Sequence, residues 1–359
     1  MNVVIIGAGV AGLGVGWRLL QAGCQVTILE RSQPALGATW AAAGMLAVTA
    51  ELEDAAQAEQ DLALRAQALW PGFVAELEAA SQKPVFFNRG GALLLAPDAP
   101  ALEVMRARAQ GELRILGPKE VQGLVPLLGE TLGGLWSPQE AHVDNRALGA
   151  ALAIAFLKAG GTLNPNEAVV RIEMAGGRAV GVLTPYRRYD ADAILVAAGA
   201  WSGLLEEIPI IPVKGEVIAL TPPDGVGLPG PVVWGQGVYC VPRHNRLLVG
   251  ATVQEQGFDT SPTSQGRDFL WRRAASLMPA VKDWKLADHW AGLRPKSPDA
   301  LPLLGPTAVR GLFVAGGQYR NGILFAPAIA GEVADIMLGK SVPVPDFDPR
   351  RFGPVHERL

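Results

Sequence analysis

Short apolar runs rich in β-branched residues alternate with stretches of helical periodicity at the start of the chain. Residues 2–6 (NVVII) are too β-branched to begin a helix and end at Gly7, which predicts a strand. Residues 10–22 have helical spacing and are followed by Gly23, a residue typical of helix C-termini. Residues 25–30 predict a second strand. Because a helix connects the two strands, we expect them to be parallel neighbours.

The remaining pattern predicts further helices and strands in mixed order. Helical spacing covers residues 53–80, 100–110, 118–124, 145–159, 264–277 and 323–338. Strand patterns cover residues 85–96 (a pair around Gly90-Gly91), 134–143, 167–174, 178–184, 189–197 and 311–316. Residues 210–262 are dense in Pro, Gly and β-forming residues, which favours antiparallel strands.

These elements indicate an α/β protein, α+β overall, with a Rossmann-type domain on a parallel sheet and a second, largely antiparallel substrate domain. The length of 359 residues fits two domains. We expect both to be discontinuous. The first takes residues 1–50, 145–200 and 306–345, the second takes 51–144 and 201–305, and residues 346–359 form a C-terminal tail.

Residues 7–12 (GAGVAG) match the pattern G-x-G-x-x-G. With 43 glycines among 359 residues, such a match arises by chance roughly 0.6 times in a chain. A second match at 225–230 has no strand before it, and Pro229 interrupts the helix that should follow, so we expect a loop there. The first match lies between a strand and a helix, and Glu30 ends the next strand.

That context favours a dinucleotide site over an ordinary tight turn. Glycines let the backbone approach a pyrophosphate at the helix N-terminus, and an acid at the end of the second strand accepts hydrogen bonds from ribose hydroxyls. Glu30 would repel a 2′-phosphate, which disfavours NADP, although Arg31 beside it acts in the opposite direction. The motif alone fits both FAD and NAD.

Composition and charge exclude several other classes. The formal charge is −3 without a basic block, which argues against nucleic-acid binding, and no apolar run reaches the length of a membrane span. Two cysteines exclude a disulfide framework, and four scattered histidines lack metal-ligand spacing, so we expect no metal. The first residues lack the features of a signal peptide, and we expect a cytoplasmic protein.

Longer segments carry a more specific signal. The most distinctive are residues 41–46 (AAAGML), 212–216 (PVKGE), 239–243 (YCVPR), 290–295 (WAGLRP) and 320–327 (RNGILFAP). With these segments the chain, from its N-terminus to about residue 338, resembles the D-amino-acid oxidase-like flavoproteins and, within them, the glycine oxidases linked to thiamine biosynthesis.

The resemblance implies non-covalent FAD in the first domain. Related sarcosine oxidases attach flavin through a cysteine shortly after the position of Arg294, and residues 295–304 contain none. A helix starting near Asn321 would direct its N-terminus at the flavin N1/O2 locus. The implied cofactor-binding residues are Gly7, Gly9, Val10, Ala11, Gly12, Glu30, Arg31, Ala38, Thr39, Ala43, Gly44, Met45, Val169, Gly199, Trp201, Gln318, Tyr319, Arg320, Asn321, Gly322, Ile323 and Leu324.

The resemblance also implies the substrate site. Arg294 would bind the carboxylate of a small amino acid, with help from Tyr239 and Arg320; the alternative is that Arg294 pairs a structural acid. No side chain acts as acid or base. A histidine found in some relatives two positions before the tyrosine is Gly237 here, which leaves the side-chain preference open.

The implied reaction transfers a hydride from the substrate Cα to flavin N5. Dioxygen then becomes hydrogen peroxide, and the imine hydrolyses to a 2-oxo acid and ammonia. A homotetramer and a hand-over of iminoglycine to thiazole synthase are further implications. Three alternatives stay open: an oxidase for D-amino acids or sarcosine, a dehydrogenase that reduces a quinone, and a non-catalytic dinucleotide-binding protein.

Overall fold

A six-stranded sheet forms one layer of the protein. The computed structural model describes residues 1–52, 55–206 and 208–353. The strand order is β18-β19-β12-β1-β2-β8, in which the edge strand β18 is antiparallel and the others are parallel. The strands are β1 (Asn2–Ile6), β2 (Gln25–Leu29), β8 (Thr162–Asn164), β12 (Ala193–Val196), β18 (Leu303–Pro306) and β19 (Leu312–Gly316). The expected parallel pairing of the first two strands is confirmed.

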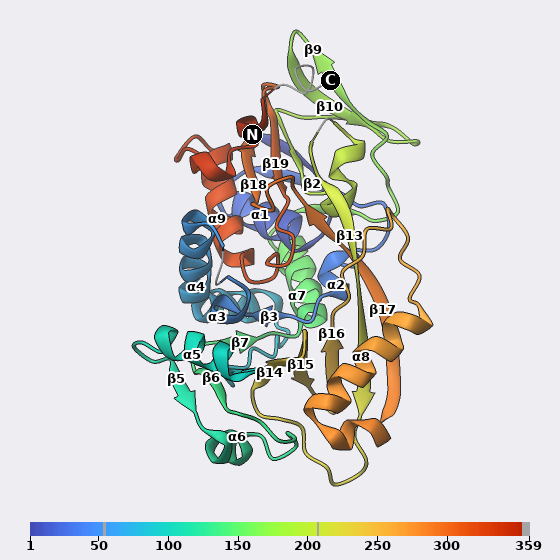
Figure 1. The fold of residues 1–359 in the computed structure, drawn as a ribbon. Coiled ribbons are helices and arrows are strands. Elements are labelled where there is room, and N and C mark those ends of the chain that lie inside the picture. Colours follow the sequence, from blue (N-terminus) through green and yellow to red (C-terminus); the bar gives the residue numbers. More distant parts are fainter. Residues whose placement is uncertain (53–54, 207, 354–359) are drawn as a thin grey trace.

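Both faces of this parallel sheet are covered. The side chains of β1 alternate between the two faces and are buried on each of them. Val3 and Ile5 pack into a core shared with the helices, whereas Val4 and Ile6 pack toward a three-stranded antiparallel sheet on the other face. The helices are α1 (Val10–Gln21), α4 (Gln57–Ser81), α7 (Asn145–Lys158) and α9 (Ala326–Met337). The covering strands are β9 (Arg171–Ala175), β10 (Arg178–Leu183) and β11 (Arg188–Asp190) (Figure 1).

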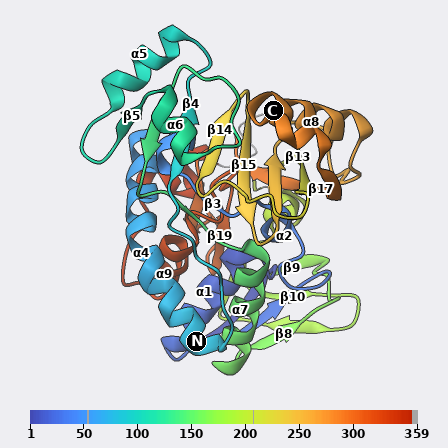
Figure 2. The ribbon, with the colours of Figure 1, turned by 90° about the horizontal axis from the view of Figure 1, so that it is seen from below.

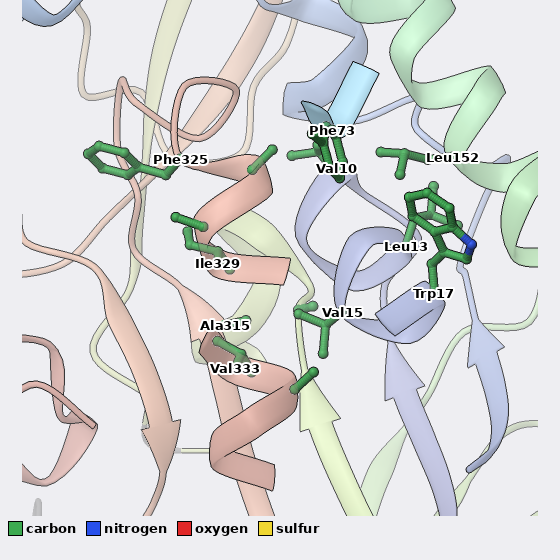
Figure 3. Packing of buried hydrophobic residues seen from close by; sticks show 14 of the residues in the cluster. Val10, Leu13, Val15, Trp17, Phe73, Leu152, Ala315, Phe325, Ile329 and Val333 are labelled. Atoms are coloured by element: carbon green, nitrogen blue, oxygen red, sulfur yellow. The ribbon is translucent and has the colours of Figure 1, made fainter. Parts of the chain in front are cut away.

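Figure 3 shows the helical core, where Val10 and Val15 of α1 lie toward α9, which carries Ile329 and Val333, and Leu13 lies on the other side of α1, near Leu152 of α7. Their backbones approach closely, since a Cβ on Gly14 would lie 3.2 Å from the Cβ of Ala330. The helix that carries the glycine motif is therefore fixed against the C-terminal helix.

An eight-stranded sheet forms the second layer, in the order β17-β13-β16-β15-β14-β4-β6-β5, and all its pairs are antiparallel except β14 with β4. Its strands are β4 (Ala92–Leu95), β5 (Arg114–Leu116), β6 (Gly134–Ser137), β13 (Ile211–Thr221), β14 (Val232–Gly235), β15 (Val238–Arg243), β16 (Arg246–Gly250) and β17 (Lys285–Lys296). Helices α6 (Pro118–Leu124) and α8 (Ser264–Leu277) cover one face, and the view from below shows them beside the sheet (Figure 2).

Short elements connect the two layers. They are α2 (Ala38–Ala41), α3 (Val48–Glu51) and the two-stranded sheet of β3 (Met45–Leu46) with β7 (Ala141–His142). The peripheral helix α5 (Ala99–Arg108) packs against β5 and β6 of the eight-stranded sheet. 3₁₀ turns cover Gly199–Leu204, Pro279–Asp283, Pro345–Phe347 and Pro349–Phe352. The mixed fold predicted from the sequence is confirmed, and no helix in the described ranges is long and apolar enough to cross a membrane.

Two local predictions are wrong. Residues 85–96 do not form a strand pair: only Ala92–Leu95 is a strand, and it pairs with β6 and β14, whereas Asn88 pairs with His142 of β7. Helix α9 begins at Ala326 rather than near residue 321, and residues 322–325 form turns. The second glycine match, at 225–230, is a loop, as predicted.

The division into two discontinuous domains stays a prediction, and two placements bear on it. Helix α4, which the sequence assigned to the second domain, packs with α7 and α9 of the first. Residues 303–305, assigned to the second domain, pair with β19 in the parallel sheet. In the tail, residues 346–353 form 3₁₀ turns, and residues 354–359 lie outside the described part.

Glu140 makes the stability of the fold depend on pH. Its carboxylate is 1% exposed and accepts hydrogen bonds from the backbone N–H groups of Thr49 (2.5 Å) and Ala50 (3.2 Å). Burial raises its pKa from 4.5 to about 7, against the effect of these hydrogen bonds. The folded state therefore holds this proton more tightly than the unfolded chain, and stability is lost as the pH rises through about 7.

We expect Glu140→Gln to remove this loss, because the amide is neutral and its oxygen still accepts from the backbone. Between pH 5 and pH 8 the wild-type free energy of unfolding should fall by about 2–3 kcal/mol more than that of the variant. Urea denaturation at the two pH values measures this difference. Equal falls in both proteins would contradict the assignment.

Candidate functional site

One large cavity, of about 910 Å³, lies between the two sheets. The residues that follow β1, β12 and β19 line one side, at the carboxyl ends of these parallel strands. Val217, Tyr239 and Gly250 of the antiparallel sheet line the other side. The carboxyl ends of parallel strands are the usual place for a bound nucleotide in folds of this type.

The glycine turn forms one end of the cavity. Helix α1 begins at Val10 with Gly9 as its N-cap and has no acid in its first turn, and the N–H of Val10 donates to Thr39 Oγ1 at 3.0 Å. Gly7 has a φ of 105°, and a Cβ on Gly12 would lie 2.0 Å from the carbonyl oxygen of Gly7. The turn therefore depends on these two glycines, and no acid in the first turn of the helix competes with a pyrophosphate for its N-terminus.

Glu30 joins this turn to the end of β2. Its carboxylate accepts hydrogen bonds from the backbone N–H groups of Ala8 and Ser32, both at 2.9 Å, and from the Ser32 hydroxyl at 3.1 Å. Arg31 lies 3.4 Å from the ring centroid of Trp201, which stacks on Phe258. Burial is the main reason that the pKa of Arg31 is lowered. These groups form a charged and aromatic wall suited to a nucleoside.

We expect Glu30→Ala to weaken FAD retention, since it removes the ribose acceptor and frees the N–H of Ala8. The flavin content after dialysis measures this effect. Glu30→Gln is the matched variant, because its amide oxygen can still accept the bond from Ala8. Full flavin content in Glu30→Ala would contradict the ribose assignment.

The middle of the cavity is lined by Ala43, Gly44, Met45 and Gln318. Gly44 has a φ of 75°, and a Cβ there would lie 2.0 Å from the carbonyl oxygen of Val143, which fixes the path of this segment. Gln318 is 6% exposed, and its Nε2 has no hydrogen-bond partner among the described residues. A buried amide donor without a partner fits a ligand that carries carbonyl groups, as the flavin ring does.

These observations show that the cavity fits FAD. A glycine turn at a helix N-terminus without an acid in its first turn matches the pyrophosphate, and the unpartnered amide of Gln318 matches the ring. No group of three or more His, Cys, Asp or Glu residues that could hold a metal ion occurs in the part of the chain that the structure describes.

Arg294 of β17 lies in the wall of the cavity that the antiparallel sheet provides. Its Nη1 donates to the carbonyl oxygens of Lys214 (3.3 Å) and Thr252 (3.1 Å). Among residues 1–52, 55–206 and 208–353 it forms no ion pair with a carboxylate. Its charge is held in place and left without an anion, which argues against the alternative that it only pairs a structural acid.

Tyr239, Arg320 and Glu51 complete this end of the cavity. Burial raises the pKa of Tyr239 to about 12, so its hydroxyl stays protonated and can donate. Arg320 Nη1 lies 3.6 Å from Glu51 Oε2. Glu51 could not be identified from the sequence, because the run AVTAELE contains no distinctive motif.

The structure brings nearly all the predicted site residues to this one cavity. Those that line it are Gly7, Gly9, Val10, Ala11, Glu30, Arg31, Ala38, Thr39, Ala43, Gly44, Met45, Val169, Gly199, Trp201, Tyr239, Arg294, Gln318, Tyr319, Arg320, Gly322 and Ile323. Gly12, Asn321 and Leu324 do not line it. Gly12 packs against Gly7, and Asn321 Nδ2 donates to Glu59. The carbonyl of Leu324 accepts from Trp70.

Comparison with known proteins gives consistent matches. The model of the family described as DAO, FAD dependent oxidoreductase, matches residues 2–336. A glycine oxidase of Pseudomonas aeruginosa is 33% identical, over 98% of both chains. The crystal structure of glycine oxidase from Geobacillus kaustophilus has a TM-score of 0.89 and 32% identity, over 98% of this chain and 97% of that one.

A bifunctional protein ThiO/ThiG of Synechocystis sp. is 36% identical over 98% of this chain. The chain spans 54% of the length of that relative, so the similarity covers one part of the bifunctional protein.

Proposed function

Because the chain belongs to the family of FAD-dependent oxidoreductases, we propose that it oxidises glycine and other small amino acids. The products are a 2-oxo acid and ammonia, formed by hydrolysis of the imine, and hydrogen peroxide, formed from dioxygen. The observation that carries this proposal is a positioned guanidinium, Arg294, that has no anion among the described residues and lies in a cavity that also fits FAD. Bound FAD supplies the oxidation, by accepting a hydride from the substrate Cα and passing electrons to dioxygen.

The protein's own residues bind and orient the substrate. Arg294 binds the carboxylate, with the guanidinium held by the carbonyls of Lys214 and Thr252. The protonated hydroxyl of Tyr239 donates to the same carboxylate. Trp234 and Met45 add apolar area to the cavity and exclude water from the C–H bond.

A visible spectrum of the purified protein, kept anaerobic, tests this function directly. A yellow protein that bleaches with glycine and regains colour in air supports amine oxidation with oxygen as acceptor. A protein that bleaches and stays pale in air is a dehydrogenase with another acceptor. A protein that remains yellow with glycine would contradict glycine as the substrate, and D-amino acids and sarcosine are then tested in the same way.

We expect activity to rise with pH, because the substrate reacts with its nitrogen unprotonated and its ammonium group must lose a proton. Steady-state rates with glycine across the alkaline range measure this dependence. A flat profile would contradict reaction from the neutral amine.

Three finer proposals concern the protein's context. The enzyme is a homotetramer, it works in the cytoplasm, and it hands the imine of glycine to thiazole synthase in thiamine biosynthesis. The hand-over is supported by the Synechocystis relative, whose name joins ThiO and ThiG in one bifunctional protein. The cytoplasmic location is supported by two buried cysteines without a disulfide, as a reducing compartment favours.

A further inference from the structure

Glu51 brings a negative charge into the end of the cavity that holds two guanidinium groups. It is the last residue of the short helix α3, and its side chain is 10% exposed. It lines the same cavity as Arg294, Tyr239 and Arg320. Burial raises the pKa of Glu51, while the positive charges of Arg320 and Arg294 act in the opposite direction. The carboxylate therefore lies within electrostatic reach of both arginines.

Two other carboxylates in the same region are already occupied by the fold. Glu140 accepts backbone hydrogen bonds from Thr49 and Ala50, and Glu59 accepts from Asn321 Nδ2 at 3.1 Å. Neither residue lines the cavity. Their roles are accounted for by packing and hydrogen bonding, so they do not compete with Glu51 for a role toward the substrate.

The polar contact of the Glu51 carboxylate is longer than those of the Glu140 and Glu59 carboxylates. Within the described ranges its polar contact is the one with Arg320, at 3.6 Å, which is longer than the 2.7–2.9 Å typical of a charge-assisted hydrogen bond. Arg320 is itself 44% exposed. Lone pairs of Glu51 are thus available to a donor that enters the cavity.

The chemistry of the substrate supplies such a donor. An amino acid carries its carboxylate and its nitrogen on one Cα, so both groups occupy the same small volume. Arg294 has no anion among the described residues and takes the carboxylate, whereas Glu51 has unused acceptor capacity and suits the N–H groups. Resting on the function proposed above, we propose that Glu51 accepts a hydrogen bond from the substrate nitrogen and selects amino acids over carboxylic acids that lack one.

This role separates two kinds of ligand. Acetate offers a carboxylate and no nitrogen, so it uses Arg294 and makes no use of Glu51. Glycine uses both. In the FAD-loaded enzyme, Glu51→Gln should raise KM for glycine by about tenfold or more, and leave the inhibition constant of acetate unchanged or lower it, because a negative charge has been removed.

Two variants control for damage to the fold. Glu51→Asp keeps the charge and should recover part of the affinity for glycine. Glu332→Gln removes a carboxylate of α9 that pairs with Arg65 of α4 and does not line the cavity, and it should leave both constants unchanged. Melting temperatures of all variants show whether Glu51→Gln is folded. If it is not, KM for glycine and the inhibition constant of acetate are compared between Glu51→Asp and the wild-type enzyme instead.

Equal increases for glycine and acetate in Glu51→Gln would overturn the inference and assign Glu51 a structural role. Unchanged constants for both would also overturn it. If the wild-type enzyme binds glycine without oxidising it, the proposed function fails separately. The affinities for glycine and acetate are then read from changes in the visible spectrum, and the role of Glu51 is decided by the same difference.

Discussion

Replacing Arg294 by alanine is expected to raise KM for glycine by about 30- to 1000-fold, while FAD stays bound. The loss corresponds to about 2–4 kcal/mol, because the substrate carboxylate enters the cavity without its charged partner. The guanidinium contacts the carbonyls of Lys214 and Thr252 and no residue of the glycine turn, so the cofactor end is unaffected. Steady-state kinetics and the flavin content of the purified variant measure the two effects.

Gly215→Ala tests the position of the same guanidinium without removing its charge. A Cβ at Gly215 would lie 2.2 Å from Arg294 Nη1, so the side chain must move. We expect a smaller increase in KM than in Arg294→Ala, with FAD again retained. An unchanged KM in Arg294→Ala would remove this residue from substrate binding.

The second large effect is expected at Gly12. A Cβ there would lie 2.0 Å from the Gly7 carbonyl oxygen and 3.3 Å from the Ala197 Cβ, in a turn fixed between β1 and α1. Since the contact is with backbone, the overlap cannot be relieved by a side-chain rotation. Gly12→Ala should destabilise the protein without FAD by about 3 kcal/mol or more and abolish flavin binding.

Gly9→Ala is the matched variant within the same motif. Its backbone has an ordinary φ of −77°, and an added Cβ would contact Thr39 Oγ1 at 3.5 Å, a normal distance. We expect the protein without FAD to keep its melting temperature, while FAD affinity falls because the new methyl group lies in the cavity wall. Thermal denaturation without FAD and titration with FAD separate the two outcomes. Similar losses of stability in both variants would contradict this division of roles.

Local features made the nucleotide end of the site predictable. The strand, glycine turn and helix at residues 2–22 depend on neighbours in the sequence, because β-branched residues favour the strand and a fixed glycine spacing is required by close backbone contacts. Comparison with relatives then confirmed the family expected from the longer segments. The start of α9 was misplaced, because the turns at 322–325 continue the helical spacing of the sequence.

The sequence by itself determined the βαβ unit and the fold class, and nearly all the site residues that the family resemblance implied line the cavity. Only the tertiary structure decided that Glu51 lies beside Arg320 and that Arg294 has no anion among the described residues. It also decided that Gly12 packs against the backbone of Gly7 rather than lining the cavity. The reason is physical. Local conformation follows from the residues of one segment, whereas the charge environment of a side chain depends on groups that are brought together only when the two sheets pack.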